Sequence, residues 1–237
     1  EVSLRDGLQP VKNFVPTNYK LEWLKAQLAA GFCEVEVTSF VPASVIPQFS
    51  DAKKVLSEAL KLSQLRADVL VPNVKGAELA LENGARNICF VISASEAHNF
   101  ANVNCSTARS LEMLKEIVKK VHLYDDYHKV NICGVIATAF GCSIQGKVEK
   151  RRVFEIVDKM LALGLAEIII ADTVGFGTPY EVKKIMKKVV EICDSTPVGC
   201  HFHDTRGTGI ANVVSAVDVG VRKFDSSIQG LGGCPFA

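Results

Sequence analysis

Hydrophobic and polar positions recur in blocks along this chain. A short apolar run is followed by a polar turn and then by a segment with helical spacing. The runs are EVSL (1–4), CEVEVTSF (33–40), ADVLVPN (67–73), NICFVISA (87–94), VNICGVIATAF (130–140), EIIIADTVG (167–175), VGCHFHD (198–204) and KFDSSIQG (223–230). Strand-like runs that alternate with helix-like segments predict parallel strands joined by helical crossovers.

Seven helix-like segments lie between these eight runs. Residues 19–31 place three leucines on one face of a helix, with a glycine to end it. Residues 178–192 begin with a capping box, because Thr178 can cap the first turn, Pro179 suits the first helical position and Glu181 follows three residues after the cap.

Eight strands at this spacing favour a (β/α)8 TIM barrel formed by residues 1–237 as a single domain. The sequence starts and stops abruptly, so we expect the barrel to be C-terminally truncated, without the closing helix after the eighth strand. An open doubly wound sheet is the alternative, although no GxGxxG follows the first strand. With 48% hydrophobic residues, the chain can bury a sizeable core.

The charge balance points to a small-molecule partner. The chain carries 27 basic and 26 acidic residues, for a net charge of +1. This argues against nucleic acid or a membrane surface as the partner, because no excess of positive charge is available. We find no secretory signal. The eight cysteines form no CxxC pair, and most sit in apolar runs, so we interpret them as reduced residues in a cytosol-like compartment.

Polar residues gather where the predicted strands end, which is where barrel enzymes place their active sites. His201 and His203 lie two residues apart, so their side chains share one face of a strand. Asp6 lies at the end of the first predicted strand. Two imidazoles and a carboxylate suit Mg²⁺, Mn²⁺, Fe²⁺ or Zn²⁺. The alternative is two ordinary histidines at the edge of the barrel.

Three further charged residues near strand ends are candidates for the chemistry. Arg5 could hold an enolate or carboxylate oxygen, or form only a salt bridge. Glu36 is at least as suited to holding Arg5 as to direct catalysis. Asp172 could cap the turn at Thr173 or orient a substrate hydroxyl.

The segment GLGGCPFA (230–237) has three glycines in four positions and ends the chain. A cysteine at the tip of such a loop, Cys234, could be an acid–base group on a closing lid. The alternative is a tight turn with an incidental thiol.

Six ordered motifs resemble the 3-hydroxy-3-methylglutaryl-CoA lyase family. They are RDGLQ (5–9), EVTSFV (36–41), GCS (141–143), DTVGFGTP (172–179), HFHDTRG (201–207) and DSSIQGLGGCPFA (225–237). The wider group of TIM-barrel metallolyases includes the isopropylmalate and homocitrate synthases. Those synthases usually show HxHND where this chain has HFHDT, which favours the lyase branch.

The resemblance implies cleavage of 3-hydroxy-3-methylglutaryl-CoA to acetyl-CoA and acetoacetate by a retro-Claisen mechanism. It implies a divalent metal, Mg²⁺ or Mn²⁺. The implied metal ligands are Asp6, His201 and His203, and the implied catalytic residues are Arg5, which also binds substrate, His201, Cys234, Glu36 and Asp172. A fourth family ligand, an asparagine, falls just after the last residue of this sequence.

One departure from the family keeps related substrates open. The family carries an arginine on the strand near Cys133, where this chain has NICGVIAT, so a related short-chain 3-hydroxyacyl-CoA is an alternative substrate. Cys142 matches a family cysteine, and we expect it to pack below the edge of the site.

Other readings differ in class. The same metal could serve a Claisen-condensing acyl transferase, HxH also occurs in metal-dependent hydrolases, and a barrel that does not close would have no activity.

We expect a CoA thioester as partner, and a homodimer is compatible with the resemblance. The compartment would be the cytoplasm for a bacterial chain and the mitochondrial matrix for a eukaryotic one. Residues 102–106 (NVNCS) could offer polar groups to the nucleotide, but a plain helix start explains them equally well.

Overall fold

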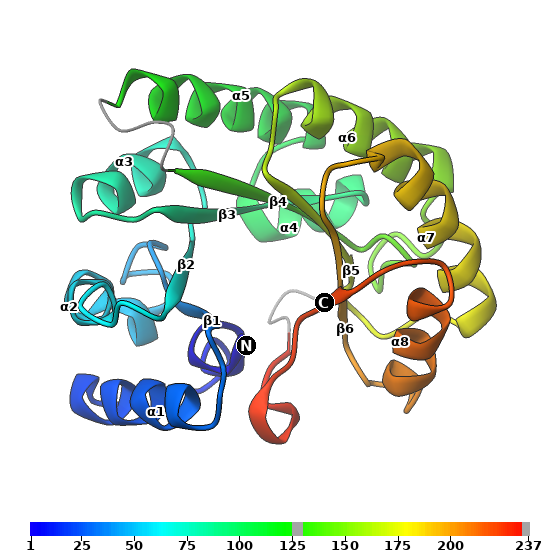
Figure 1. Ribbon diagram of the computed structural model, residues 1–237. Helices are drawn as coiled ribbons and strands as arrows, with labels where there is room; N and C mark the ends of the chain where they lie inside the picture. Colours follow the sequence, from blue (N-terminus) through cyan, green and yellow to red (C-terminus); the bar gives the residue numbers. More distant parts are fainter. Residues whose placement is uncertain (125–129, 234–237) are drawn as a thin grey trace. The chain divides into compact units, whose positions relative to one another are not determined.

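The computed structural model describes residues 1–124 and 130–233. Its strands form a parallel α/β sheet in which they follow the order of the chain, from β1 to β7 (Figure 1). The strands are β1 (Glu34–Ser39), β2 (Arg66–Leu70), β3 (Asn87–Ser93), β4 (Asn131–Ala137), β5 (Glu167–Asp172), β6 (Val198–Phe202) and β7 (Lys223–Phe224). The described residues divide into two compact units. Unit 1 comprises the described part of 1–90, 116–131 and 226–233, and unit 2 comprises 91–115 and 132–225.

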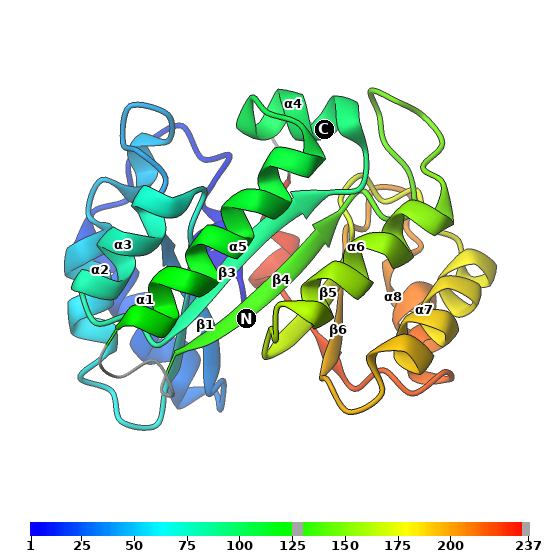
Figure 2. The ribbon, with the colours of Figure 1, turned by 90° about the horizontal axis from the view of Figure 1, so that it is seen from above.

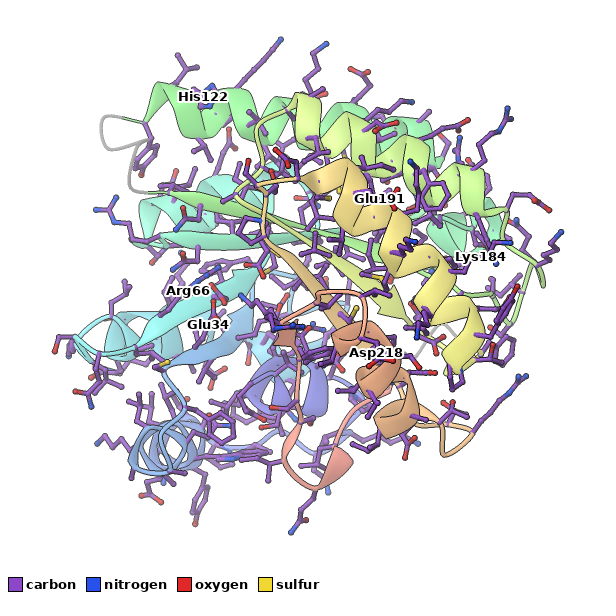
Figure 3. The ribbon with its side chains drawn as sticks, turned by 45° about the vertical axis from the view of Figure 1, so that its right-hand side comes forward. Glu34, Arg66, His122, Lys184, Glu191 and Asp218 are labelled. Carbon is purple, nitrogen blue, oxygen red and sulfur yellow. The ribbon has the colours of Figure 1, made fainter. Side chains whose placement is uncertain are left out.

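In unit 1, β1 pairs with β2 and β2 pairs with β3, all parallel. The helices α1 to α3 lie on the same side of β1 and β2 (Figures 1 and 2). Their bounds are α1 (Thr17–Ala29), α2 (Ala52–Ala59) and α3 (Val74–Glu82). At the start of the first strand pair, Glu34 and Arg66 form an ion pair of 2.5 Å (Figure 3). Both side chains are about one-third exposed, so this pair contributes little to stability.

The prediction of a first strand at EVSL (1–4) is wrong. Ser3–Gly7 forms a π-helical turn, η1, that carries Arg5 and Asp6. Only Glu1 and Val2 bond like a strand: the Glu36 amide donates to the Glu1 carbonyl at 2.9 Å, and the Val2 amide donates to the Ser226 carbonyl at 2.9 Å. The chain then coils because the amides of residues 5, 6 and 7 all donate to the Val2 carbonyl. The eighth predicted run is also reduced, with only Lys223–Phe224 in a strand followed by the 3-10 turn η4 (Ile228–Gly230).

In unit 2, β4, β5, β6 and β7 pair in parallel. Every residue of β5 is buried, as expected for a strand covered on both faces. The helices α6 to α8 lie beside β5 and β6 (Figure 1). The helices of this region are α4 (Glu96–Val103), α5 (Thr107–Leu123), α6 (Lys150–Ala162), α7 (Pro179–Cys193) and α8 (Gly209–Val217), of which α5 continues into unit 1.

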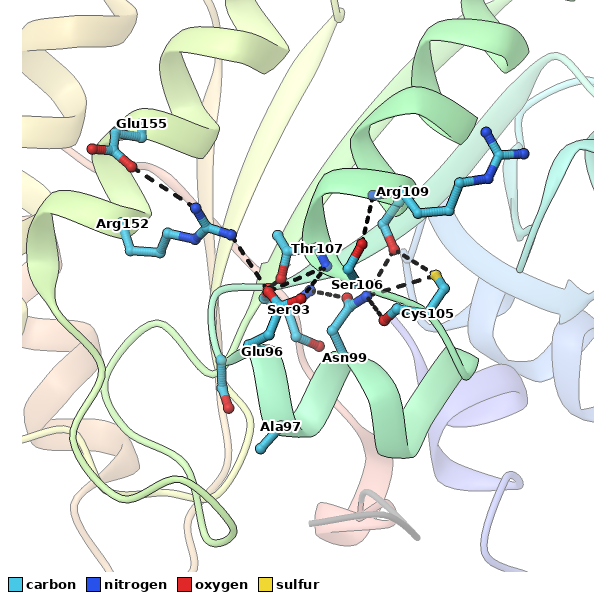
Figure 4. Close-up of polar contacts among 12 residues, drawn as sticks. Ser93, Glu96, Ala97, Asn99, Cys105, Ser106, Thr107, Arg109, Arg152 and Glu155 are labelled. Carbon is cyan, nitrogen blue, oxygen red and sulfur yellow. Dashed lines mark hydrogen bonds and ion pairs between the residues drawn. The ribbon is translucent and has the colours of Figure 1, made fainter.

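The predicted cap of α7 is confirmed, because the Thr178 side chain accepts a hydrogen bond from the Glu181 amide. The sequence missed α4, a helix of eight residues. Its junction with α5 is polar inside: buried Asn99 accepts from the Ser93 amide at 3.0 Å and donates to the Ser110 hydroxyl at 2.8 Å (Figure 4). Polar residues that serve such an internal network hide the apolar spacing that would predict a separate helix.

The C-terminal ends of β3, β4 and β5 are joined by hydroxyl groups. The Thr138 hydroxyl accepts from the Ser95 amide at 3.0 Å, and the Thr138 amide donates to the Thr173 hydroxyl at 2.7 Å. Thr138 is fully buried and has φ 57°, a conformation that β-branched residues rarely adopt. The lateral bonds hold this residue in place at the end of β4.

Among the residues that the structure describes, no helix combines the length and the apolar character that crossing a membrane requires.

Candidate active site and metal centre

In unit 1, Arg5 is the centre of a buried ionic cluster. Its Nε donates to Glu36 Oε2 at 2.7 Å, and its Nη1 donates to Asp6 Oδ1 at 2.8 Å and to Gln9 Oε1 at 3.1 Å. Nη2 lies 2.7 Å from the same Glu36 oxygen. Arg5 and Asp6 come from η1, Gln9 follows that turn, and Glu36 comes from β1. The coil of η1 lets the two adjacent residues, Arg5 and Asp6, reach each other, which a strand would prevent.

The electrostatics of this cluster keep Arg5 charged. Burial lowers the pKa of Arg5, but the nearby carboxylates of Glu36 and then Asp6 outweigh burial and raise the pKa above its ordinary value. A guanidinium has five N–H groups. The contacts with Glu36, Asp6 and Gln9 use Nε, Nη1 and one side of Nη2. Among the described residues, this leaves an Nη2 N–H that can meet an incoming oxygen.

In unit 2, His201 and His203 face each other at the end of β6. Their Nε2 atoms are 3.1 Å apart and their ring centroids 4.9 Å apart. On its other side, His201 Nδ1 lies 2.9 Å from Asp225 Oδ2. A carboxylate only accepts hydrogen bonds, so His201 Nδ1 carries the proton and its Nε2 presents a lone pair toward His203.

This pair fits a metal centre. Two nitrogens bound at right angles to an ion, each about 2.1 Å from it, are about 3.0 Å apart. The 3.1 Å separation of the two Nε2 atoms matches that spacing. A carboxylate on the far nitrogen of a ligating histidine is the usual arrangement around bound metals, because it fixes the tautomer and the ring orientation. The imidazole nitrogens with a carboxylate behind one of them therefore suit Mg²⁺, Mn²⁺, Fe²⁺ or Zn²⁺.

Asp172 is fully buried at the end of β5 and organises the turn that follows. Its two carboxylate oxygens accept from the amides of Phe176 and Gly177, each at 2.9 Å. Burial raises the pKa of Asp172, and these two amides, together with Arg206 and His201, oppose the rise. The sequence suggested that Asp172 caps the turn at Thr173. In the structure, its carboxylate caps this turn through the amides of Phe176 and Gly177.

The glycine-rich segment before Cys234 runs along η1 in unit 1. A Cβ on Gly232 would lie 3.0 Å from Asp6 Oδ2, and a Cβ on Gly7 would lie 3.1 Å from the Leu231 side chain. Gly232 also has φ 150°, which side chains rarely adopt. The two glycines allow this close approach. Cys234 itself lies outside the described residues.

Two residues that the sequence did not single out join these clusters. Gln9 accepts from Arg5, and Asp225 bonds His201. Both lie inside the motifs RDGLQ and DSSIQG, so membership of these motifs was the available signal. Cys133 is buried in β4. Cys142 is also buried, and its sulfur accepts from the Ser95 hydroxyl at 3.1 Å, which agrees with a packing role.

The structure thus places the candidate residues in two sets. Arg5, Asp6 and Glu36 belong to unit 1, and Asp172, His201 and His203 belong to unit 2. The participation of Asp6 with the two histidines in one site stays a prediction.

Comparisons with known proteins identify the family of the chain. The family model described as HMGL-like matches residues 1–234. Curated relatives include the mitochondrial hydroxymethylglutaryl-CoA lyases of Arabidopsis thaliana and Bos taurus, each 37% identical over the whole chain. The chain spans 50% of the Arabidopsis protein and 72% of the bovine one. A Bacillus subtilis relative, the lyase YngG, is 36% identical, and the chain spans 78% of it.

Solved structures give the same family and fold. An HMG-CoA lyase from Acinetobacter baumannii, in complex with coenzyme A and 3-methylmalate, is 40% identical with a TM-score of 0.93, and the match covers all of this chain and 76% of that one. The carboxyl transferase domain of Rhizobium etli pyruvate carboxylase, with oxalate, is 17% identical with a TM-score of 0.70, and the match covers 98% of this chain and 40% of that one. The second match supports the fold alone. The TIM-barrel type of fold is confirmed, and the chain belongs to the HMGL-like family.

Proposed function

We propose that this protein is a divalent-metal-dependent carbon–carbon lyase that cleaves 3-hydroxy-3-methylglutaryl-CoA to acetyl-CoA and acetoacetate. The observation that carries the proposal is the facing pair of His201 and His203, with Asp225 behind His201. Membership of the HMGL-like family supports it, and the curated relatives described above are named as lyases. The lyase names do not favour the condensing acyl transferase.

Asp6, His201 and His203 would hold the metal, Mg²⁺ or Mn²⁺, and the proposal requires the two units to bring these residues together. A bound divalent ion would lower the pKa of the substrate hydroxyl and neutralise charge on its oxygen. All the other steps belong to the chain's own side chains.

The reaction breaks the C2–C3 bond of the substrate. A general base takes the C3 hydroxyl proton. The electron pair of the C2–C3 bond then passes to the thioester fragment, which leaves as an enolate, and C3 becomes the ketone of acetoacetate. Arg5 would donate its available Nη2 N–H to the thioester oxygen, where the negative charge develops. Glu36 holds the guanidinium in position for this task through two contacts to one oxygen.

The enolate carbon must then take a proton to give acetyl-CoA. His201, which the family resemblance implies as catalytic, is one candidate for this step, and Asp225 fixes its orientation. Cys234, on the segment that follows Gly233, is the second candidate. Asp172 would act by positioning the turn after β5.

The partner in this proposal is a CoA thioester, and we infer no nucleic-acid or membrane partner. A homodimer is proposed as the assembly. For the compartment, we propose the cytoplasm of a bacterium or the mitochondrial matrix of a eukaryote.

The test is production of acetoacetate from 3-hydroxy-3-methylglutaryl-CoA by metal-stripped protein, with and without Mg²⁺ or Mn²⁺, beside a His201→Ala variant. We expect acetoacetate only with metal and only from the unsubstituted protein. A folded, metal-loaded protein that releases none would overturn this substrate. Shorter and longer 3-hydroxyacyl-CoA thioesters, the alternative that the absent arginine near Cys133 leaves open, would then be tried in the same assay.

A further inference from the structure

The loops after β5 and β6 in unit 2 hold an arginine on an aromatic ring. The guanidinium carbon of Arg206 lies 4.2 Å from the centroid of Phe176. Phe176 is in the turn that Asp172 organises, and Arg206 is three residues after His203. The pair therefore joins the turn after β5 to the segment that carries the two histidines.

Contacts on both sides fix this pair. The Phe176 amide donates to Asp172 Oδ1 at 2.9 Å, so buried Asp172 sets the position of the ring's backbone. The other loop is pressed against the same turn, because a Cβ on Gly175 would lie 2.8 Å from the Thr205 side chain and 3.0 Å from the His203 carbonyl oxygen. Gly175 has φ 67°, which glycine adopts readily. Thr205, which precedes Arg206, therefore packs closely against Gly175, which precedes Phe176.

The next layer of this turn is aromatic. The Phe176 ring lies against Gly141, where a Cβ would be 3.1 Å from its Cδ2. Phe140 and Phe202 pack nearby with ring centroids 5.9 Å apart. Phe176 therefore packs against Gly141 and also carries Arg206.

The charge of Arg206 is exposed and has no protein carboxylate bonded to it. Within the described residues, its side chain stacks on Phe176 and acts on Asp172 through its charge, without a hydrogen bond or ion pair. Asp204 is close to Arg206 in the sequence, and Asp172 interacts with its charge. Both carboxylates are bonded to backbone amides. Asp172 accepts two backbone amides, and Asp204 accepts from the Gly209 amide at 2.6 Å.

Stacking on a ring uses the face of a guanidinium and leaves its edge free. The N–H groups in that edge form the fork that matches a carboxylate or a phosphate. Arg206 is thus held on the ring, and the donors in its edge can meet an anion.

We propose that Arg206, held on Phe176, binds an anionic group of the CoA thioester, either a phosphate of the CoA moiety or the carboxylate of the acyl group. This inference rests on the proposed function and adds a specificity-determining residue to it. A carboxylate and a phosphate can each present two oxygens to the two parallel N–H groups of the guanidinium. The experiment below distinguishes the two anions.

The experiment compares two thioesters of 3-hydroxy-3-methylglutarate, one of CoA and one of pantetheine, which lacks the phosphates and keeps the carboxylate. KM and kcat are measured for the unsubstituted protein, Arg206→Ala, Arg206→Lys and Phe176→Leu. Lys184→Ala is the matched control, because Lys184 is an exposed cation on α7 of the same unit (Figure 3).

For Arg206→Ala we expect KM to rise about tenfold or more, as for a lost hydrogen bond to a charged group, with kcat nearly unchanged. A rise confined to the CoA thioester assigns Arg206 to a phosphate, and an equal rise with both thioesters assigns it to the carboxylate. Arg206→Lys and Phe176→Leu should give smaller rises. No change in KM for either thioester, or an equal change in Lys184→Ala, would overturn the proposal.

Calorimetric titration of CoA keeps this test separate from the proposed function. If the unsubstituted protein neither cleaves the thioester nor binds CoA, the proposed function fails. If it does both and Arg206→Ala does the same with unchanged constants, only the inference about Arg206 fails.

Discussion

The two candidate clusters solve opposite electrostatic problems. Around Arg5, charges satisfy one another: one cation meets two carboxylates and an amide oxygen, and the side chains of Arg5 and Asp6 are only 12% and 14% exposed. Around His201, two imidazole nitrogens face each other at 3.1 Å, and the Asp225 carboxylate stands behind one of them. The first cluster is electrostatically complete, whereas the second gains most when a cation lies between its nitrogens.

This contrast separates two kinds of site residue. A complete ionic cluster is preorganised, so its value in a reaction comes from a donor that is already aimed before the substrate arrives. A pair of facing imidazole nitrogens is suited to binding an ion, so its value depends on what is bound. The variants below test that difference.

The largest effect is expected from the histidines. Replacing His203 with Ala removes one of the facing nitrogens, and activity should fall roughly a thousand-fold or more, because several kcal/mol of charge stabilisation by the ion would be lost. Activity at saturating Mn²⁺ and bound Mn²⁺ after dialysis are the two measurements. His122→Ala, on the exposed end of α5 (Figure 3), is the matched control and should change neither. Full Mn²⁺ retention by His203→Ala would contradict the metal site.

Arg5→Lys tests the complete cluster. A lysine keeps the charge but cannot contact Glu36, Asp6 and Gln9 with one planar group, so kcat should fall on the order of 10² to 10³ while bound Mn²⁺ is retained. Arg66→Lys is the matched control, since Arg66 also bridges two carboxylates in unit 1 and lies outside the candidate site. If Arg5→Lys lost metal as His203→Ala does, the division between the two clusters would not hold.

Asp225→Asn tests the group behind His201. The amide can still accept from Nδ1 but carries no charge, so Mn²⁺ affinity should fall about 10- to 100-fold. Titration of Mn²⁺ with a chelator competitor measures the change. An unaltered affinity would mean that Asp225 has only a structural role, and Asp218→Asn on the surface of unit 2 controls for loss of charge.

The smallest effect concerns stability in unit 1. Lys20 is buried, and burial lowers its pKa although Asp51 opposes the shift. The folded state therefore binds fewer protons than the unfolded state between the lowered pKa and the ordinary lysine value, so stability rises with pH in that alkaline window. The groups that face the Lys20 ammonium are Asp51, the Gln48 carbonyl and the Phe14 ring.

Urea unfolding of the protein and of Lys20→Met, at neutral pH and at increasing alkaline pH, measures this effect. The difference in unfolding free energy should move in favour of Lys20 as the pH rises. A difference that stays constant would show that the ammonium is not penalised by burial.

Sequence reasoning placed most of the strands because their apolar runs have to be buried on both faces. It failed at Ser3–Gly7, because Val2 and Leu4 are buried in a coil as fully as they would be in a strand. A four-residue apolar run carries no period that distinguishes the two. The helix at Glu96–Val103 was missed because its inner residues, His98 and Asn99, are polar.

For the site, spacing alone put His201 and His203 on one face, and the structure confirms that they face each other. The contact of Arg5 with Glu36 followed from charge. Gln9 and Asp225 could not be chosen, because an amide and an acid at a strand end are common and only their partners give them a role. The Arg206–Phe176 pair needed the fold of two loops that are 30 residues apart in sequence.

Thr138 makes the C-terminal ends of three strands in this region depend on one another. A buried threonine at φ 57° costs on the order of 1–3 kcal/mol by itself, and it is tolerated because Thr173 just after β5 and Ser95 just after β3 hold it. If either neighbour came loose, the residue would relax to an ordinary conformation and withdraw its bonds from the other. The ends of β3, β4 and β5 should therefore exchange their amide hydrogens as one unit, so that the loops they support open together.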